Sequence, residues 1–594
     1  MPLQTERGNR SEPRWVWAAC WLLILFLFAS RIVLLFHRLY DPDEFEHLHA
    51  GVSVAQGQIP YRDFFEHHGP LTYTIAGGIA QWTGANLTLF SALRAVSLAF
   101  SVATLAGVYC VASRMYGKGA GLIGILFLES WPWFQEKSLE YRPDVLATCF
   151  LIWAVWFAVA NATSIWRRGV PIGLCLGLAS LCTLKIVFLV LGIAAGAVFT
   201  QWSRSAKWKG QMAATAFAGV IPIAAYSVYF WQKNALMIFW EHVFWLPIVW
   251  TEREPFHEFC FALQQWSPIH LGLGAAAIAY SICKLSCRIV SRTKGECVLT
   301  LAVVLHFAAI PWLKAVFLQY YLLGLPFVAV LAAGMVCRLS LRRTVARKRG
   351  LRSARMDWVL LLCLTSMIVG MAVNEKTTEL CLKTLRLCYE SGSMQPFQSL
   401  PRVRLYFGVD TISLLLALFA ATIAMLLTPF SQVGLIGIKR RVMLGILWIA
   451  LAVPTLNRLI LPHFEWRNDG QREDLALIDK LVQPGEKVLD GFSGLGALRP
   501  HALYWWWLNP HSIPLMYQRE GHAYIQQALA IEPPAMIIFD GYLDNYLRNH
   551  FAEQVVRKYQ IVDQKLRSSN AILYIRNDLQ HRTKTKDFSS PDGK

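Results

Sequence analysis

Residues 40–71 read YDPDEFEHLHAGVSVAQGQIPYRDFFEHHGPL and closely follow a hydrophobic span, Trp15–Phe36, that is long enough to cross a membrane. Ionisable residues are dense in this stretch, which holds Asp41, Asp43, Glu44, Glu46, His47, His49, Arg62, Asp63, Glu66, His67 and His68. Charged groups at a bilayer surface cost desolvation energy, so a dense group of them marks a candidate functional site. The sequence therefore predicts a functional loop, residues 38–87, directly after the first transmembrane helix of an integral membrane protein.

The composition excludes an ordinary soluble protein. Of the 594 residues, 55% are hydrophobic and 16% are charged, and the mean hydropathy is +0.38. Trp15–Phe36 is too long for a signal-peptide core and no small-residue cleavage site follows it, which predicts an uncleaved transmembrane helix. The net charge of +19 lies largely in short connectors between apolar spans. That distribution is typical of cytoplasmic loops and argues against a nucleic-acid partner.

The basic connectors predict the topology. The strongest basic cluster lies within 338–355, and placing all such clusters in the cytoplasm requires roughly thirteen crossings of about 20 residues each. The predicted spans are 15–37, 88–113, 119–134, 143–161, 170–184, 186–201, 211–231, 267–287, 297–312, 316–337, 357–374, 408–428 and 442–461. An odd number of spans puts the N-terminus in the cytoplasm and the C-terminus outside. The loop at 40–71 and everything after 462 are then expected on the outer face.

The C-terminal region changes character and predicts a small extracytoplasmic α/β domain at 462–580. Short β-rich runs lie at Lys487–Phe492, Ala535–Asp540 and Ala571–Ile575. Helical periodicity is present at 472–483, 501–508, 521–530 and 543–559. The glycines of LDGFSGLGALRP do not have the dinucleotide-binding spacing and are interpreted as a strand-to-helix turn. Residues 581–594 are expected to form a disordered tail.

A helix is predicted from Pro42 to Gln56 at the start of the charged stretch. Asp41 as N-cap, Pro42 at the first helical position and Glu44 at the third form a capping-box pattern. Asp41 is interpreted as a cap alone. For Asp43 and Glu44 capping is a weaker explanation, because one acid suffices and three are present. The helix N-terminus should keep Asp43 ionised, as a general base requires.

Several motifs resemble a known family. DPDEFEHLHA (41–50), PYRDFFEHHGPL (60–71), EYRPDVLA (140–147) and LQYYLLGLPFVAVLAA (318–333) resemble integral-membrane glycosyltransferases of the C-type (GT-C) fold. The nearest types are the protein O-mannosyltransferases and the lipid A aminoarabinose transferase. The resemblance implies transfer of a sugar from a polyprenyl-phosphate carrier to an acceptor on the outer face. It implies Asp43 as the catalytic base with Glu44 beside it, Asp144 as a second acid, and Glu66 at the start of the EHHGP stretch. His67 and His68 replace the lysine of the aminoarabinose enzymes.

The chemistry of such a transfer can be argued from the residues themselves. A base must deprotonate the acceptor, and cations must hold the departing phosphate. Lys185 is prominent, because it is a lone cation in LCTLKIVFLV between two short apolar runs. Snorkelling to the interface is the alternative for Lys185, and pairing with Glu140 or Asp144 is the alternative for Arg142. The candidate phosphate-binding residues are Arg62, His67, His68, Arg142, Lys185 and Lys314.

A divalent metal is a further open alternative. His47, His49, His67, His68 and Glu66 offer the mixed carboxylate and imidazole ligands that suit zinc or manganese, although their spacing matches no recognised metal motif. No cofactor is required by the predicted chemistry. Glu66, His47 and Tyr320 are candidates for contact with either an acceptor or a metal.

Together these features predict a polytopic α-helical membrane protein with residues 1–461 as a GT-C-like transmembrane domain. The predicted activity is inverting transfer of a hexosyl or pentosyl group to a lipid or protein acceptor, as in protein glycosylation or lipopolysaccharide modification. The predicted location is the cell inner (plasma) membrane. The alternative is a multi-spanning transporter or lipid flippase. Transporters place charges near the bilayer midplane and often show repeated halves. Here the richest acidic cluster lies at the outer surface, and no repeated halves are present.

Overall fold

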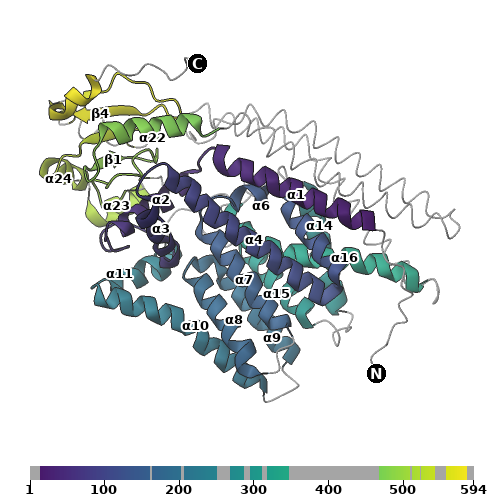
Figure 1. Ribbon diagram of the computed structural model, residues 1–594. Coiled ribbons are helices and arrows are strands. Elements are labelled where there is room, and N and C mark those ends of the chain that lie inside the picture. Colours follow the sequence, from purple (N-terminus) through teal and green to yellow (C-terminus); the bar gives the residue numbers. More distant parts are fainter. Residues whose placement is uncertain are drawn as a thin grey trace, which may run out of the picture.

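The computed structural model describes residues 14–160, 164–201, 207–249, 268–286, 294–310, 318–346 and 467–506, and, with short gaps, 508–584. Helices form a bundle over the described residues up to 346, and a four-stranded sheet with its own helices lies at one end of it, next to α2 and α3 (Figure 1). The helices of the bundle are α1 (Arg14–His37), α2 (Pro42–Ala55), α3 (Pro70–Thr83), α4 (Thr88–Tyr116), α5 (Lys118–Glu129), α6 (Pro132–Lys137), α7 (Pro143–Val159), α8 (Ile165–Ser180), α9 (Val187–Gln201), α10 (Lys207–Gln232), α11 (Leu236–Trp240), α12 (Leu246–Val249), α14 (Pro268–Ser286), α15 (Lys294–Ala309) and α16 (Leu325–Ala346). Shorter turns are η1 (Leu184–Ile186), the π-helical η2 (Glu241–Trp245) and η5 (Leu318–Leu323).

Three segments of the described helices are long and apolar enough to cross a membrane by length and composition. They are Cys20–His37, Thr88–Tyr116 and Trp208–Gln232, with mean hydropathies of 2.2, 1.9 and 1.5 in their most apolar windows. Shorter apolar helices accompany them, among them Pro143–Val159 and Leu325–Arg338. These helices agree with the predicted polytopic membrane protein.

Small residues allow close packing within the bundle. A side chain added at Gly173 of α8 would lie 2.2 Å from the carbonyl oxygen of Thr215 in α10, and one at Gly177 would lie 2.4 Å from that of Gly219. Backbones at this distance gain dispersion contacts that do not depend on the hydrophobic effect, which is absent between helices in lipid. The G-x-x-x-G spacing of α8 thus explains how it seats against α10.

The predicted spans can be compared with these helices. Three of them, 357–374, 408–428 and 442–461, lie outside the described residues; each of the others coincides with one or more apolar helices. The span predicted at 119–134 is not one continuous helix, because α5 ends at Glu129 and α6 begins at Pro132. Pro132 disfavours helical geometry in the preceding residue, Trp131, whose backbone is extended. The span predicted at 316–337 starts with η5, and α16 itself begins only at Leu325.

The loop after α1 contains two helices. α2 has the predicted capping box: Asp41 accepts from the backbone N–H of Asp43, and Glu44 accepts from that of Asp41. It ends as predicted before Gly57, whose φ of 87° favours glycine. The second helix, α3, was not predicted. Pro70 at its first position and Gly84 after its last residue were available as signals, and α3 packs against α2.

The C-terminal sheet has the strand order β1-β2-β4-β3, with β1 and β2 parallel and the other neighbours antiparallel. Its elements are α22 (Asp469–Leu481), β1 (Val488–Asp490), α23 (Ser512–Glu520), α24 (Tyr524–Ile531), β2 (Met536–Phe539), β3 (Tyr559–Ile561), β4 (Ile572–Arg576) and η8 (Asn577–Lys584). The three predicted strands correspond to β1, β2 and β4.

Several other predictions for this region are wrong. Residues 501–506 form no helix, because His501 bridges to Val488 beside β1. No helix starts within the glycine-rich segment after β1. Of the predicted helix 543–559, the described residues 543, 555, 557 and 558 are helical, Tyr559 begins β3, and the others lie outside the described residues. The helix α23 was not predicted.

The C-terminal sheet region contacts the loop at 38–87 directly. The backbone N–H of Phe65 donates to the carbonyl of Tyr504 at 2.9 Å, and the Tyr504 hydroxyl donates to the carbonyl of Tyr61 at 2.6 Å. The rings of Phe65 and Trp505 stack with centroids 4.3 Å apart. Residues 61–66 are therefore held between the helical bundle and the C-terminal region.

Candidate active site

Asp43 and Arg142 meet where two helices begin. Asp43 lies in the first turn of α2, and Arg142 directly precedes α7. Arg142 Nη2 donates to Asp43 Oδ2, and Nη1 donates to Glu140 at 2.7 Å. The side chain of Arg142 is 3% exposed, whereas that of Asp43 keeps 30%. A buried cation thus fixes a carboxylate that remains open to water.

Further ion pairs surround Arg142 on its buried side. Lys137 Nζ donates to Asp41 Oδ2 at 2.8 Å and to Glu140 Oε1 at 2.9 Å, while Arg38 Nη2 donates to Glu140 Oε1 at 2.7 Å. The interpretation of Asp41 as a cap alone is therefore wrong, because it also forms ion pairs. We call the set Arg38, Asp41, Asp43, Glu136, Lys137, Glu140 and Arg142 the compensated cluster, because each of its acids contacts a lysine or arginine.

Asp144 and Lys185 form a neighbouring pair. Lys185 lies in η1 between α8 and α9, and its Nζ is 3.4 Å from Asp144 Oδ2. The same Nζ lies 4.0 Å from the centre of the Tyr320 ring. Lys185 is the lone cation of its local sequence, and in the fold it pairs with Asp144. Arg142 and Lys185 each interact electrostatically with both Asp43 and Asp144, so the structure brings the two predicted acids together.

Glu44 has a different environment from Asp43. Arg94 Nε and Nη2 each donate to one Glu44 oxygen at 2.7 Å, and both side chains are almost fully buried. Arg94 also donates to the backbone carbonyls of Leu35, Arg38 and Leu39. These contacts tie α2 to α1 and α4. The predicted catalytic function of Glu44 stays a prediction, and its geometry favours a structural function.

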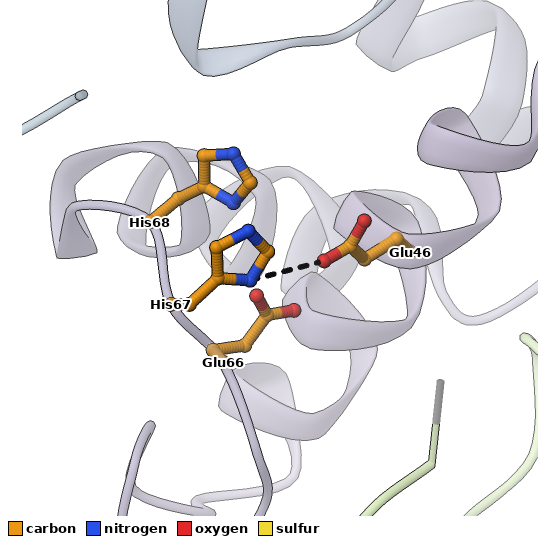
Figure 2. A group of neighbouring side chains, drawn as sticks. All are labelled: Glu46, Glu66, His67 and His68. Atoms are coloured by element: carbon orange, nitrogen blue, oxygen red, sulfur yellow. Dashed lines mark ion pairs between the residues drawn. The ribbon is translucent and has the colours of Figure 1, made fainter. Parts of the chain in front are cut away.

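Glu46, Glu66, His67 and His68 form a second group, which we call the Glu–His cluster (Figure 2). Glu46 comes from α2 and the others from the segment before α3, and one ligand atom of each lies within 4.8 Å of the others. Figure 2 shows the His67 ring between the ring of His68 and the two carboxyl groups, with His67 Nδ1 3.8 Å from Glu46 Oε1. Both glutamates are buried and both histidines are partly exposed.

The segment that carries this cluster is firmly anchored. Tyr73 of α3 donates from its hydroxyl to Glu66 Oε2 at 2.5 Å. Nδ1 of His242 lies 2.8 Å from the backbone carbonyl oxygen of Glu66, and the Tyr61 hydroxyl donates to that of His68 at 2.6 Å. The orientation of the cluster is thus set by contacts outside it.

The remaining predicted residues are not members of either cluster, or they lie outside the described residues. His49 is within 3.1 Å of the carbonyl oxygen of Ala497 and its ring lies on Trp506, so its inclusion among the metal ligands is wrong. His47 is buried with its ring centre 5.3 Å from that of His68. Arg62 is exposed and pairs with Asp63 rather than with either cluster. Lys314 lies outside the described residues.

Burial and neighbouring charges shift the pKa values of Asp41 and Asp43 in opposite directions. Burial would raise the pKa of Asp41, but Lys137 and Arg142 outweigh it and hold the pKa well below its usual value. Burial raises the pKa of Asp43, and repulsion from Asp41 adds to this, while Arg142 opposes it. A carboxylate with a raised pKa is the stronger proton acceptor.

In the Glu–His cluster the pKa values of both carboxyl groups are raised, as for Asp43 and in contrast to Asp41. Burial raises the pKa of Glu66 to about 8, with the hydrogen bond from Tyr73 opposing the shift. Burial and repulsion from Glu66 raise the pKa of Glu46 well above its usual value. Burial lowers the pKa of His68, which favours the neutral imidazole.

Sequence reasoning missed Glu46, Lys137 and Tyr73 as members of the site. Glu46 could have been found, because it lies three residues after Asp43 and so shares a helix face with it. Lys137 lay in a predicted outer loop with no local signal. Tyr73 belongs to the unpredicted helix α3.

Part of the chain matches a family model. Residues 67–262 match the dolichyl-phosphate-mannose-protein mannosyltransferase family. The matched residues are about a third of the chain and include Arg142, Asp144 and Lys185. No curated protein sequence matches the chain.

The fold is similar to that of solved membrane glycosyltransferases. ArnT from Cupriavidus metallidurans bound to undecaprenyl phosphate has a TM-score of 0.57 at 14% identity, with 95% of this chain and 98% of that chain covered. The apo state of the same protein gives 0.57 at 15% identity, with 94% and 98% covered. The archaeal oligosaccharyltransferase AglB from Archaeoglobus fulgidus, in complex with an inhibitory peptide and a dolichol-phosphate, gives 0.50 at 11% identity, with 95% and 77% covered. The chain is therefore a membrane protein with the GT-C fold, and the predicted resemblance to this type is confirmed.

Proposed function

We propose that this protein is a glycosyltransferase that moves a sugar from a polyprenyl-phosphate carrier to an acceptor at the outer face of the membrane. The observation that carries this proposal is the placement of Asp43 and Asp144 beside Arg142 and Lys185. A base and phosphate-binding cations are the two requirements of the reaction, and here they share one neighbourhood. The fold and the family match support the same class of reaction.

Asp43 is the proposed base. Its carboxylate is partly exposed, more than any other acid of the compensated cluster, so an acceptor hydroxyl or amine can reach it from water. Arg142 fixes its orientation. Attack of the deprotonated acceptor on the face of the sugar opposite the phosphate inverts the anomeric carbon, which is the stereochemical outcome that we propose.

Arg142 and Lys185 are the proposed phosphate-binding cations. Both are held by acids in the structure, and a lipid phosphate offers each of them a competing anion. Lys185 lies in η1, at the start of the apolar segment Leu184–Phe199, where a polyprenyl tail can remain in lipid while its phosphate reaches the cation. Tyr320 limits the movement of Lys185 from the other side.

The proposed orientation places the loop at 38–87 and the C-terminal region outside, in the cell inner (plasma) membrane. It rests on the basic connectors in the sequence. A phosphatase fused after residue 464 should be active, and one fused within 338–355 should be inactive. The reverse pattern would put the acidic loop in the cytoplasm.

Lipid analysis of cells that lack the gene tests the activity. Without the enzyme, a polyprenyl-phosphate-sugar should accumulate, and mass spectrometry of lipid extracts should detect it. Wild-type protein and Asp63→Asn, a matched change in the same loop, should both clear the lipid, whereas Asp43→Asn should not. Clearance by Asp43→Asn would refute the assigned base. Movement of the lipid across vesicles by purified protein, without cleavage, would instead indicate a flippase.

A further inference from the structure

The Glu–His cluster has the composition and the size of a metal site. Two carboxylates and two imidazoles converge from α2 and the segment before α3, with their ligand atoms within 4.8 Å of one another (Figure 2). Ligands bound to zinc at about 2.0–2.1 Å in a tetrahedron lie about 3.3 Å apart. The 3.8 Å between His67 Nδ1 and Glu46 Oε1 is too long for a direct hydrogen bond and close to that ligand spacing. Small side-chain rotations would complete the tetrahedron.

Neither acid of the cluster forms a direct ion pair with a lysine or arginine among the described residues, although Arg142 and Lys185 interact electrostatically with Glu46. Glu46 and Glu66 are 6% and 1% exposed. Two ionised carboxylates this close and this buried repel each other strongly. A bound cation removes the repulsion; the alternative is a proton shared by the two carboxyl groups.

Glu66 is oriented as a ligand would be. Its Oε2 accepts the short hydrogen bond from Tyr73. Its buried Oε1 makes no hydrogen bond of good geometry among the described residues, and the Glu46 carboxyl and the backbone N–H of His67 lie close to the Glu66 carboxyl. Buried carboxylate oxygens without partners are costly in a native fold. Around protein-bound metals, a residue outside the ligand set commonly donates a hydrogen bond to one oxygen of a carboxylate ligand and so orients the other oxygen toward the metal.

We propose that Glu46, Glu66, His67 and His68 bind one divalent transition-metal ion of the zinc or manganese class. Imidazole nitrogens select against magnesium and calcium, which prefer oxygen ligands alone. The contacts that anchor residues 61–68 hold the ligands in place before the ion binds. This set replaces His47 and His49 of the sequence prediction with Glu46.

The ion also has a use in the reaction, and this part of the inference rests on the proposed function. Glu46 and Glu66 interact electrostatically with Asp43, so the cluster belongs to the same region as the proposed base. A divalent ion held there would add positive charge near Asp43 and near the proposed phosphate-binding cations Arg142 and Lys185.

Metal binding can be measured without any donor or acceptor. The full chain, purified in nanodiscs with an affinity tag that contains no histidine, is stripped with a chelator and titrated with Zn²⁺ or Mn²⁺ alone. Calorimetry and elemental analysis should give one ion per chain. X-ray absorption at the zinc edge should show a shell of nitrogen and oxygen without sulfur. The result is independent of transfer activity, so failure of this inference is distinct from failure of the proposed function.

Variants identify the ligands. Glu66→Gln and His67→Ala should each weaken binding by about a hundredfold or more, and Tyr73→Phe by about 10–100-fold through loss of the outer hydrogen bond. His68→Ala should weaken binding too, and because His68 is partly exposed this variant should fold even where a substitution at a buried position does not. His37→Ala, an exposed histidine outside the cluster, should bind as wild type does. Absence of stoichiometric binding in wild type would favour the shared proton and overturn the proposal, as would binding that survives both Glu66→Gln and His67→Ala.

Discussion

The compensated cluster and the Glu–His cluster both place buried acids near α2, but they neutralise them in opposite ways. Glu140, which is fully buried, contacts Arg38, Lys137 and Arg142. Glu66 is equally buried, accepts a hydrogen bond from a tyrosine hydroxyl and lies near the imidazoles of His67 and His68. The first cluster is complete within the described protein. In the second, the charges of the two carboxyl groups are balanced only when a proton or a cation is bound.

This difference indicates different functions for the two clusters. Buried ion pairs are weak evidence for net stability, yet they hold groups in fixed positions, and here they fix Asp43 and Arg142. An uncompensated pair of carboxyls stores repulsion that a ligand can relieve. The compensated cluster therefore holds the proposed catalytic residues in place, and the Glu–His cluster is suited to bind a cation or a proton from solution.

The largest expected difference is in thermal stability. Glu140→Gln leaves three buried cations short of a partner and should cost about 3–5 kcal/mol. Glu66→Gln in metal-free protein keeps an acceptor for Tyr73 and removes one of two repelling acids, so its Tm should not fall. Unfolding followed by tryptophan fluorescence in nanodiscs measures both. An equal loss in the two variants would mean that the clusters do not differ in compensation.

The next effect is on turnover. Asp43→Asn keeps the size of the side chain but removes the base, so transfer should slow by about a hundredfold or more while donor binding survives. Lys185→Ala should weaken donor binding as well as turnover, and Lys185→Arg should partly restore both. Transfer from a purified polyprenyl-phosphate-sugar measures these constants. Full turnover by Asp43→Asn would move the assignment to Asp144.

A third carboxyl pair extends the comparison to the C-terminal region. Burial and repulsion from Asp540 raise the pKa of Asp490 to about 7. Because the folded protein holds this proton more tightly than the unfolded chain, its stabilisation is fully present below pH ~4 and is lost as the pH rises toward 7. Between pH 5 and 7 wild type should lose about 2 kcal/mol more than Asp490→Asn, whose lost contacts are independent of pH. The Tm difference between the two proteins, followed across this range, measures the effect; a constant difference would contradict it.

The sequence predicted what depends on local pattern. The capping box of α2, its end at Gly57 and the apolar helices follow from short-range rules, and the structure has them. The resemblance of the first loop to GT-C enzymes led to Asp43 and Asp144, which do share Arg142.

The sequence could not give contacts between distant elements. Lys137 and Asp41 are 96 positions apart, and Glu44 and Arg94 are 50 apart, so no local pattern distinguishes a compensated acid from an uncompensated one. This is why Asp41 was interpreted as a cap, why Lys185 seemed isolated, and why Glu46 was overlooked. Burial and pairing are properties of the fold, and they decide which of several neighbouring acids is available for chemistry.

Asp41 allows the smallest test, because it combines a local function with a distant one. Its side chain accepts from the N–H of Asp43 and also pairs with Lys137. Asp41→Asn keeps the cap and loses the charge, whereas Asp41→Ala loses both. Since the ion pair is lost in each, the difference in stability between the two variants isolates the cap and should be about 1 kcal/mol. The loss shared by both variants then reports the ion pair. If Asp41→Asn were as stable as wild type, the pairing with Lys137 would contribute nothing, and Asp41 would be the simple cap that its sequence suggests.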